Sequence, residues 1–193
     1  MKRYDFITRL GGAALLACST FMCANMTTAA AAPLRIVAIG ASNTQGFYIG
    51  KNGAYPAQLQ QLLKQKGIDA DVVNAGVPFD TTAGMLQRID SDVPKGTDIA
   101  ILQPGANDRR FFVSKEQRAA NIAEMERRLR ARGIKVVTYD EEIPLRYYTL
   151  DFIHLTRDGH AMIAAWLLPR IMKIAGGSRP AAPPEGSAPQ AAH

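Results

Sequence analysis

The stretch LRIVAIGASNT, residues 34–44, joins a run of apolar and β-branched residues to a turn of small residues. A short apolar run bounded by turn residues is typical of a strand that is buried on both faces. Gly40 ends the run, and Ser42 follows two positions later. The stretch therefore predicts a buried strand over Leu34–Ile39 with a serine in the turn after it.

Three more apolar runs of the same kind follow, over Asp71–Asn74, Asp98–Leu102 and Ile134–Thr138. Apolar residues recur at helical spacing between and after them, and Ser114 with Gln117 forms a capping box. These features predict helices over Tyr55–Lys66, from near Thr81 or Thr82, from Ser114 to Arg132, and after Thr156 or Asp158. Strands that alternate with helices predict right-handed crossovers and a parallel sheet with helices on both faces.

Small polar residues come directly after successive predicted strands. Ser42 follows the first, Gly76 the second, and Asn107 the third. Asp151 and His154 lie just before the last predicted helix. Because the carboxyl ends of parallel strands meet at one edge, we expect the first three groups to face a common site.

These residue types are the ones that acyl transfer needs. A serine hydroxyl attacks, a histidine removes its proton, and a carboxylate orients the imidazole. Ser42, His154 and Asp151 are the candidates for these roles. The backbone N–H groups of Ser42 and Gly76, with the Asn107 side-chain amide, are the candidate donors of an oxyanion hole.

The four segments GASNT, NAG, GAND and DFIH, in this order and spacing, resemble the Ser, Gly, Asn and His blocks of the SGNH/GDSL hydrolases. The segment DTTAG, residues 80–84, is similar to the one after the Gly block in esterase and thioesterase members. The resemblance implies a three-layer α/β/α, flavodoxin-like parallel sheet of four to five strands, with no metal or cofactor. It also implies hydrolysis of esters or thioesters through an acyl-enzyme. The substrate is a small-molecule ester or an acylated glycan, and short-chain, aryl, lysophospholipid and acetylated-sugar substrates all stay open.

Two features depart from the family pattern. Ala41 stands where the motif has Asp, so Asn43 or Asp108 is the expected substitute for that carboxylate. The stretch from Thr138 to Asp151 is short, which predicts that a fifth strand and its helix are absent or reduced to a loop. A shallow, open substrate pocket is the expected consequence.

Other interpretations of these residues stay open. Ser42 alone is typical of a turn, and Asn107, Asp108 and Asp151 are also typical turn or cap residues. A weak or inactive module that binds glycans or envelope components is the alternative function, although Ser42, Asn107 and His154 together argue against it. A phosphate-binding loop over Gly40–Gly46 lacks the lysine that such a loop requires.

The first 31 residues have the features of a secretory signal peptide. Basic residues precede an apolar run over Leu10–Ala24, and Ala29–Ala32 form a small-residue cleavage region. This predicts export to the periplasm or outside the cell, with cleavage after Ala31 and no membrane span afterwards. Cys18, in a sequence similar to a lipoprotein box, is an alternative point of processing and lipid attachment.

The rest of the chain is interpreted as one folded domain over residues 32–175 and a disordered tail rich in Pro and Ala over 176–193. Both cysteines, Cys18 and Cys23, lie in the leader, so thiol chemistry is not expected in the mature domain. The formal net charge is +6, and basic residues 115–135 alternate with glutamates. That pattern indicates a solvated helix face and argues against nucleic-acid binding.

Overall fold

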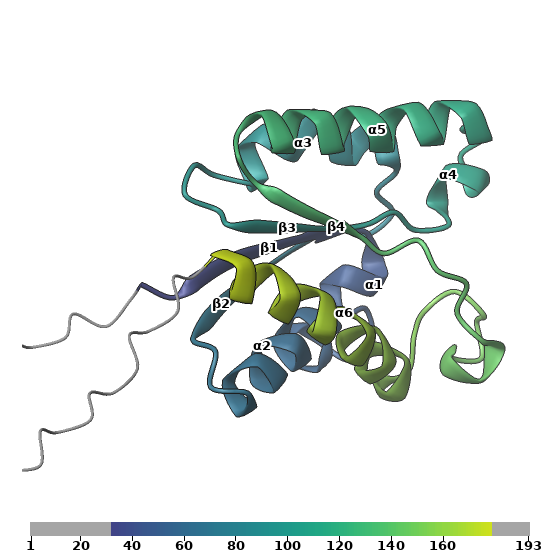
Figure 1. Cartoon of the computed structure of the whole chain (residues 1–193). Helices are drawn as coiled ribbons and strands as arrows, with labels where there is room; N and C mark the ends of the chain where they lie inside the picture. The colour runs from purple at the N-terminus through teal and green to yellow at the C-terminus, as the bar shows by residue number, and fades with distance from the viewer. Residues whose placement is uncertain (1–31, 179–193) are drawn as a thin grey trace, which may run out of the picture. The chain divides into compact units, whose positions relative to one another are not determined.

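Four parallel strands form one sheet in the order β2-β1-β3-β4 (Figure 1). The structure is a computed structural model that describes residues 32–178. Its strands are β1 (Leu34–Gly40), β2 (Ala70–Gly76), β3 (Ile99–Gln103) and β4 (Lys135–Thr138). The register places Gly40 beside both Gly76 and Gln103. The strand that the first stretch of sequence predicted therefore lies at the centre of the sheet.

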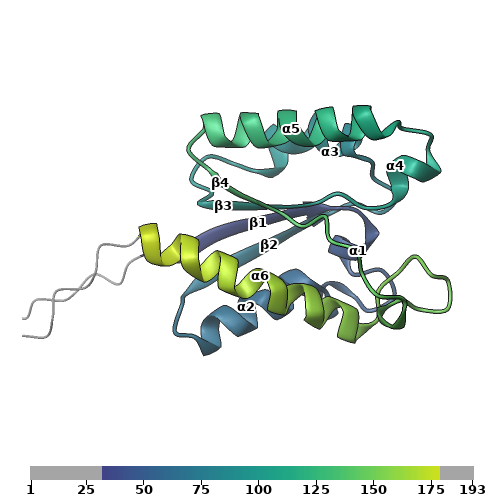
Figure 2. The same cartoon turned by 45° about the vertical axis from the view of Figure 1, so that its right-hand side comes forward.

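Helices cover both faces of the sheet, which confirms the predicted three-layer α/β/α fold (Figures 1 and 2). Helices α3 and α5 lie on one face, and α2 and α6 lie on the other. The elements are α1 (Ser42–Gln45), η1 (Lys51–Gly53), α2 (Tyr55–Gln65), α3 (Thr82–Asp92), α4 (Asn107–Arg110), α5 (Lys115–Ala131), η2 (Leu145–Tyr147) and α6 (Arg157–Ser178).

The side chains of β1 alternate between two hydrophobic cores. Ile36 and Ala38 belong to the core under α2 and α6, which also contains Leu59, Leu63, Ile163 and Leu167. Val37 and Ile39 belong to the core under α3 and α5, with Met85, Ile89, Met125 and Leu129. A strand that is apolar on both faces is what a doubly covered parallel sheet requires.

Within the described residues, the segment between β4 and α6 contains η2 and no further strand. A single antiparallel bridge, between Tyr148 and Leu155, closes this segment into a loop. The short sequence there correctly predicted the loss of a fifth strand. The loop instead carries Asp151 and His154 to the edge of the sheet.

Two sequence predictions need correction. Helix α6 continues through Ser178, so residues 176–178 do not belong to a disordered tail. The helix packs on the core as far as the buried Ala175, and adding residues to an existing helix avoids the cost of starting a new one. The Ser114 capping box is only half formed, because the Gln117 side chain donates to Asn121 Oδ1. The predicted signal peptide, Cys18, Cys23 and residues 179–193 lie outside the described residues.

His160 is a structural residue of the core. Its side chain is fully buried, and Nδ1 accepts the Tyr55 backbone N–H at 3.2 Å. This bond requires a neutral imidazole with an unprotonated Nδ1. Burial, with a smaller contribution from Arg157, lowers the pKa of His160 to about 4 from an ordinary value of 6.5.

We predict that the free energy of unfolding falls as the pH drops from 6.5 to 4. Between these pH values the imidazole is protonated in the unfolded state but stays neutral in the folded state. The free energy of unfolding therefore rises with pH in this window, and the contribution of His160 is full above pH 6.5. The expected contribution of His160 is about 3 kcal/mol. Urea unfolding at pH 7, 5.5 and 4.5 measures it, and His160→Gln should flatten the dependence. An equal pH dependence in the variant would contradict this account.

Candidate active site

The turn after β1 places Ser42 at the carboxyl edge of the sheet. Ser42 is the first residue of α1 and is only 8% exposed. A Cβ on Gly40 would lie 2.0 Å from Thr44 Oγ1, so only glycine permits this tight turn. Thr44 Oγ1 is itself fixed below the turn by the Tyr55 hydroxyl at 3.2 Å and Gln103 Oε1 at 3.1 Å. These bonds attach the turn that carries Ser42, the nucleophile candidate, to the protein core.

Asn43 joins this turn to the loop that carries His154. Its Nδ2 donates to the Ile153 carbonyl at 3.1 Å, and its Oδ1 accepts the Leu155 N–H at 3.0 Å. The two bonds bracket His154 on both sides in the chain. The serine turn and the histidine loop thus lie side by side, as the sequence predicted. The sequence did not indicate that Asn43 makes this connection.

The imidazole of His154 is held by a carboxylate on one side. Nδ1 lies 2.6 Å from Asp151 Oδ2. Asp151 Oδ1 accepts the N–H groups of Ile153 and His154, each at 2.9 Å, and the Thr149 hydroxyl at 2.7 Å. Bonds from the backbone and side chain of His154 hold the pKa of Asp151 far below its usual range. Asp151 is therefore ionised at neutral pH and selects the tautomer with the proton on Nδ1.

Aromatic rings hold the same imidazole from the other directions. Phe47 stacks on His154 with ring centroids 4.4 Å apart, and Tyr48 makes an edge contact at 5.0 Å. The His154 side chain is 13% exposed as a result. The packing leaves Nε2 as the ring nitrogen with no protein partner among the described contacts.

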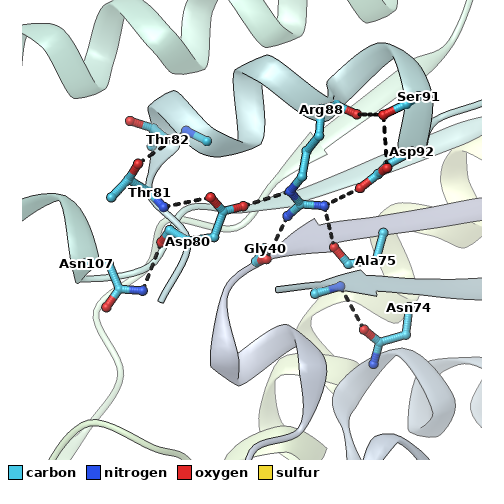
Figure 3. A network of polar contacts seen from close by, with 12 residues as sticks. Gly40, Asn74, Ala75, Asp80, Thr81, Thr82, Arg88, Ser91, Asp92 and Asn107 are labelled. Carbon is cyan, nitrogen blue, oxygen red and sulfur yellow. Dashed lines mark hydrogen bonds and ion pairs between the residues drawn. The ribbon is translucent and has the colours of Figure 1, made fainter. Parts of the chain in front are cut away.

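Asn107 begins α4, and its side chain is fixed by the loop after β2. Nδ2 donates to the Asp80 carbonyl at 2.9 Å (Figure 3). A primary amide carries two N–H groups, so this bond orients the side chain and leaves a second donor for a ligand. The sequence placed Asn107 at this edge, and the geometry suits a donor role.

The predicted role of Gly76 is wrong. Its N–H already donates to Asn74 Oδ1 at 3.0 Å and is not free for an oxyanion. The reason for glycine is packing, because a Cβ there would lie 2.2 Å from the Gln45 backbone nitrogen. Gly76 lets α1 lie against the end of β2.

The loop beyond Gly76 supplies a different candidate. Phe79 has φ of 65°, a left-handed conformation that is rare for a bulky side chain. It directly precedes Asp80, whose carbonyl binds Asn107. No hydrogen-bond partner is seen for the Phe79 N–H among the described contacts. Nothing in the sequence around Phe79 indicated this backbone conformation.

The carboxylate missing at Ala41 is not replaced by either expected residue. The Ala41 position makes no side-chain cap on α1. Asn43 is occupied by the histidine loop, and Asp108 faces away toward α3. Asp108 is 2% exposed, and its Oδ1 accepts both the N–H and hydroxyl of Thr82 at 3.0 Å. Asp108 thus binds the amino end of α3 and does not cap α4, its own helix.

Exposed aromatic residues lie in four loops, those after α1, β2 and α4 and the one before α6. They are the described non-glycine residues with positive φ, and each is more than half exposed: Tyr48, Phe79, Phe112 and Phe152. Such conformations cost roughly 1–3 kcal/mol each and persist where the surrounding structure imposes them. Arg109 and Arg110 of α4 are also exposed. We call the four aromatic residues the aromatic rim.

Other features of the described chain lie away from this edge. Two surface hollows occur at the amino ends of β2 and β4, and none of the residues above lines them. Residues 32–178 contain no cluster of three or more His, Cys, Asp or Glu side chains suited to a metal ion. No helix in the same range is both long and apolar enough to cross a membrane.

Residues 38–165 match the sequence model of the GDSL-like Lipase/Acylhydrolase family. The chain belongs to this family. The match confirms the resemblance carried by the four sequence blocks and includes Ser42, Asn107 and His154.

Two curated relatives of this GDSL-like protein have esterase names. It is 28% identical over 123 residues to "Esterase TesA" of Pseudomonas aeruginosa, covering 63% of this chain and 61% of that protein. It is 25% identical over 134 residues to "Arylesterase" of Vibrio mimicus, covering 69% and 66%. The alignments therefore span less than two thirds of the length of these relatives.

Solved structures share the fold. "Crystal Structure of TesA" aligns with a TM-score of 0.66 at 20% identity, over 72% of this chain and 99% of that one. "Crystal structure of AlinE4, a SGNH-hydrolase family esterase" aligns with a TM-score of 0.55 at 26% identity, over 83% and 88%. The first likeness shows the fold of this GDSL-like chain and nothing more.

We predict that Asn43→Ala lowers kcat for ester hydrolysis by about ten- to a hundredfold, because losing both bracketing bonds releases the His154 loop by roughly 1–3 kcal/mol. Steady-state kinetics with a soluble ester measures the effect. Asn52→Ala, at an exposed position in η1, is the matched control and should retain kcat. A fully active Asn43→Ala enzyme would show that the two Asn43 hydrogen bonds to the His154 loop are not needed for catalysis.

Proposed function

We propose that this protein hydrolyses carboxylic esters through an acyl-enzyme formed on Ser42, with His154 as general base and Asp151 as its orienting group. The observation that carries the proposal is the Asp151–His154 contact at 2.6 Å, held beside the serine turn by Asn43. Family membership supports the same reaction class.

In the first half-reaction, Ser42 Oγ attacks the ester carbonyl and passes its proton to His154 Nε2. The imidazolium that forms is stabilised by ionised Asp151. His154 then returns the proton to the departing alcohol, which leaves an acyl-serine. Water attacks this ester with the same base, and the carboxylic acid and free Ser42 are released.

The developing oxyanion needs donors at the same edge. We propose the backbone N–H of Ser42, the free Asn107 amide N–H and the Phe79 N–H in place of that of Gly76. The bond from Asn107 to Asp80 supports this set, because it joins the Asn107 side chain to the residue after Phe79. One such donor typically contributes about 3–4 kcal/mol to the transition state.

The activity implies covalent labelling at one residue. We predict that a fluorophosphonate labels wild-type protein on Ser42, and that Ser42→Ala loses labelling and at least about a thousandfold of kcat. Peptide mapping by mass spectrometry and turnover of p-nitrophenyl acetate measure the two effects. Ser114→Ala, which removes a helix cap far along the chain, is the control for general damage. Unlabelled, inactive wild type would instead favour the binding-module alternative.

The aromatic rim supports esters with an apolar acyl or aryl group as substrates. Phe112 is 96% exposed and Phe152 69%, so both have apolar surface free to cover a ligand. The relatives named for esterase and arylesterase activity fit this substrate class. Short acyl thioesters and acylated sugars are the competing classes for the same site.

We predict that Phe112→Ser and Phe152→Ser lower kcat/KM for p-nitrophenyl hexanoate about five- to tenfold but leave p-nitrophenyl acetate within about twofold. Each ring covers apolar surface of the longer chain, and roughly 1 kcal/mol is lost with it. Val73→Ser, on the exposed side of β2, is the control. Equal losses on both esters, or none, would exclude a role for the rim in acyl recognition.

We further propose that the protein acts after export. The support is the basic start, apolar run and alanine-rich end of residues 1–31. Amino-terminal sequencing of the mature protein distinguishes cleavage after Ala31 from lipid attachment at Cys18.

A further inference from the structure

Arg88 lies near the middle of α3, under the loops that form the proposed site. Its side chain is 17% exposed and donates to four acceptors (Figure 3). Two are carboxylates: Asp80 Oδ2 lies 2.8 Å from Nε, and Asp92 Oδ2 lies 2.5 Å from Nη1. Two are backbone carbonyls: Ala75 O lies 2.8 Å from Nη1, and Gly40 O lies 3.0 Å from Nη2.

The two carbonyls belong to the carboxyl ends of neighbouring strands. Gly40 is the last residue of β1 and stands two positions before Ser42. Ala75 is the next-to-last residue of β2. Ala41 provides no side-chain cap to α1, so beyond its own backbone bonds the serine turn depends on contacts with neighbouring elements. The guanidinium provides one of these contacts directly before the turn.

Asp80 extends the same network toward Asn107. One carboxylate oxygen binds Arg88, and the other accepts the Thr81 N–H at 2.9 Å. The Asp80 carbonyl accepts the Asn107 amide. A Cβ on Gly84 would lie 2.0 Å from Asp80 Oδ1, so the helix has glycine where the carboxylate is seated. Arg88 is therefore connected through Asp80 to the Asn107 side chain and to Phe79, the residue before Asp80.

We infer that Arg88 is a positioning residue for the hydrolytic reaction: it sets the distance between the Ser42 turn and the oxyanion donors on the neighbouring loops. The inference rests on the proposed function. The role requires arginine, because the planar guanidinium directs its N–H donors toward backbone carbonyls and a carboxylate in different directions at the same time. The ammonium of lysine is a single compact group and cannot hold the same set.

A purely stabilising role is the competing explanation, and Arg132 offers the matched control. Arg132 also ties two segments together through a carbonyl and a carboxylate, those of Val93 and Asp90. Its side chain is 26% exposed, close to that of Arg88. Val93 caps the carboxyl end of α3, whereas the Asp80 and Gly40 contacts of Arg88 lie at the site. Arg132 thus has similar structural bonds without a connection to the reacting groups.

The experiment compares Arg88→Ala, Arg88→Lys and Arg132→Ala with wild type. It measures kcat and KM on p-nitrophenyl acetate, the rate of fluorophosphonate labelling at Ser42, and thermal unfolding. We expect Arg88→Ala to lose about a hundredfold in kcat with KM within about threefold, since misplacement near 1 Å has that effect on rate. Labelling should slow in parallel, because phosphonylation uses the same geometry. Arg132→Ala should retain kcat within about threefold despite a similar loss of stability.

Two further readouts keep the test decisive. Millimolar methylguanidinium should restore part of the Arg88→Ala rate and none of the Arg132→Ala rate. Arg88→Lys, which keeps the charge and the fold, should still lose at least about tenfold in kcat. Full activity in Arg88→Lys, or equal kcat losses in both alanine variants, would overturn the inference while wild-type activity upheld the proposed function. A wild type that neither turns over nor is labelled would overturn both.

Discussion

The Asn43 side chain donates one hydrogen bond and accepts another, and the two connect the turn after β1 to a loop 110 residues later in the chain. A serine and a histidine can cooperate only within hydrogen-bond reach, and local sequence cannot supply that proximity. The parallel sheet brings both segments to one edge, and the amide fixes their relative position. The proposed chemistry depends on this connection, which Phe47 and Tyr48 reinforce by packing on the His154 ring.

The rest of the edge is organised around the same need for fixed distances. Thr44 anchors the serine turn from the core below, and Asp151 with Phe47 immobilises the imidazole. On the opposite side, Arg88 links the ends of β1 and β2 to Asp80, which orients Asn107. Preorganised donors stabilise a transition state because they need no rearrangement during reaction.

The fold was predictable because its signals are local. The four apolar runs each gave a strand within about two residues of its observed bounds, and the glycine and cap residues marked the helix ends. The places of Ser42 and Asn107 at one edge followed from parallel topology, which puts strand ends together. Asp151 and His154 were predicted from the needs of acyl transfer and from the family resemblance, because they follow no strand directly. Asp108 was ambiguous, since a cap and a site residue look alike in one sequence.

The errors concern contacts between segments distant in sequence. Gly76 was assigned to the oxyanion hole because glycine permits close approach, but the group that approaches is the backbone of Gln45. Asn43 and Arg88 have ordinary sequence surroundings, and their partners lie on other elements. Phe79 has a left-handed conformation that propensity assigns to glycine. Such roles arise from tertiary packing and leave no periodic pattern in the chain.

An experimental structure of the protein after reaction with a small phosphonate inhibitor tests the central claim most directly. The account predicts phosphorus bonded to Ser42 Oγ, His154 Nε2 within hydrogen-bond reach of that oxygen, and a phosphoryl oxygen about 3 Å from the Asn107 amide. A phosphonate bonded to another residue, or an adduct on Ser42 with His154 directed elsewhere, would contradict it.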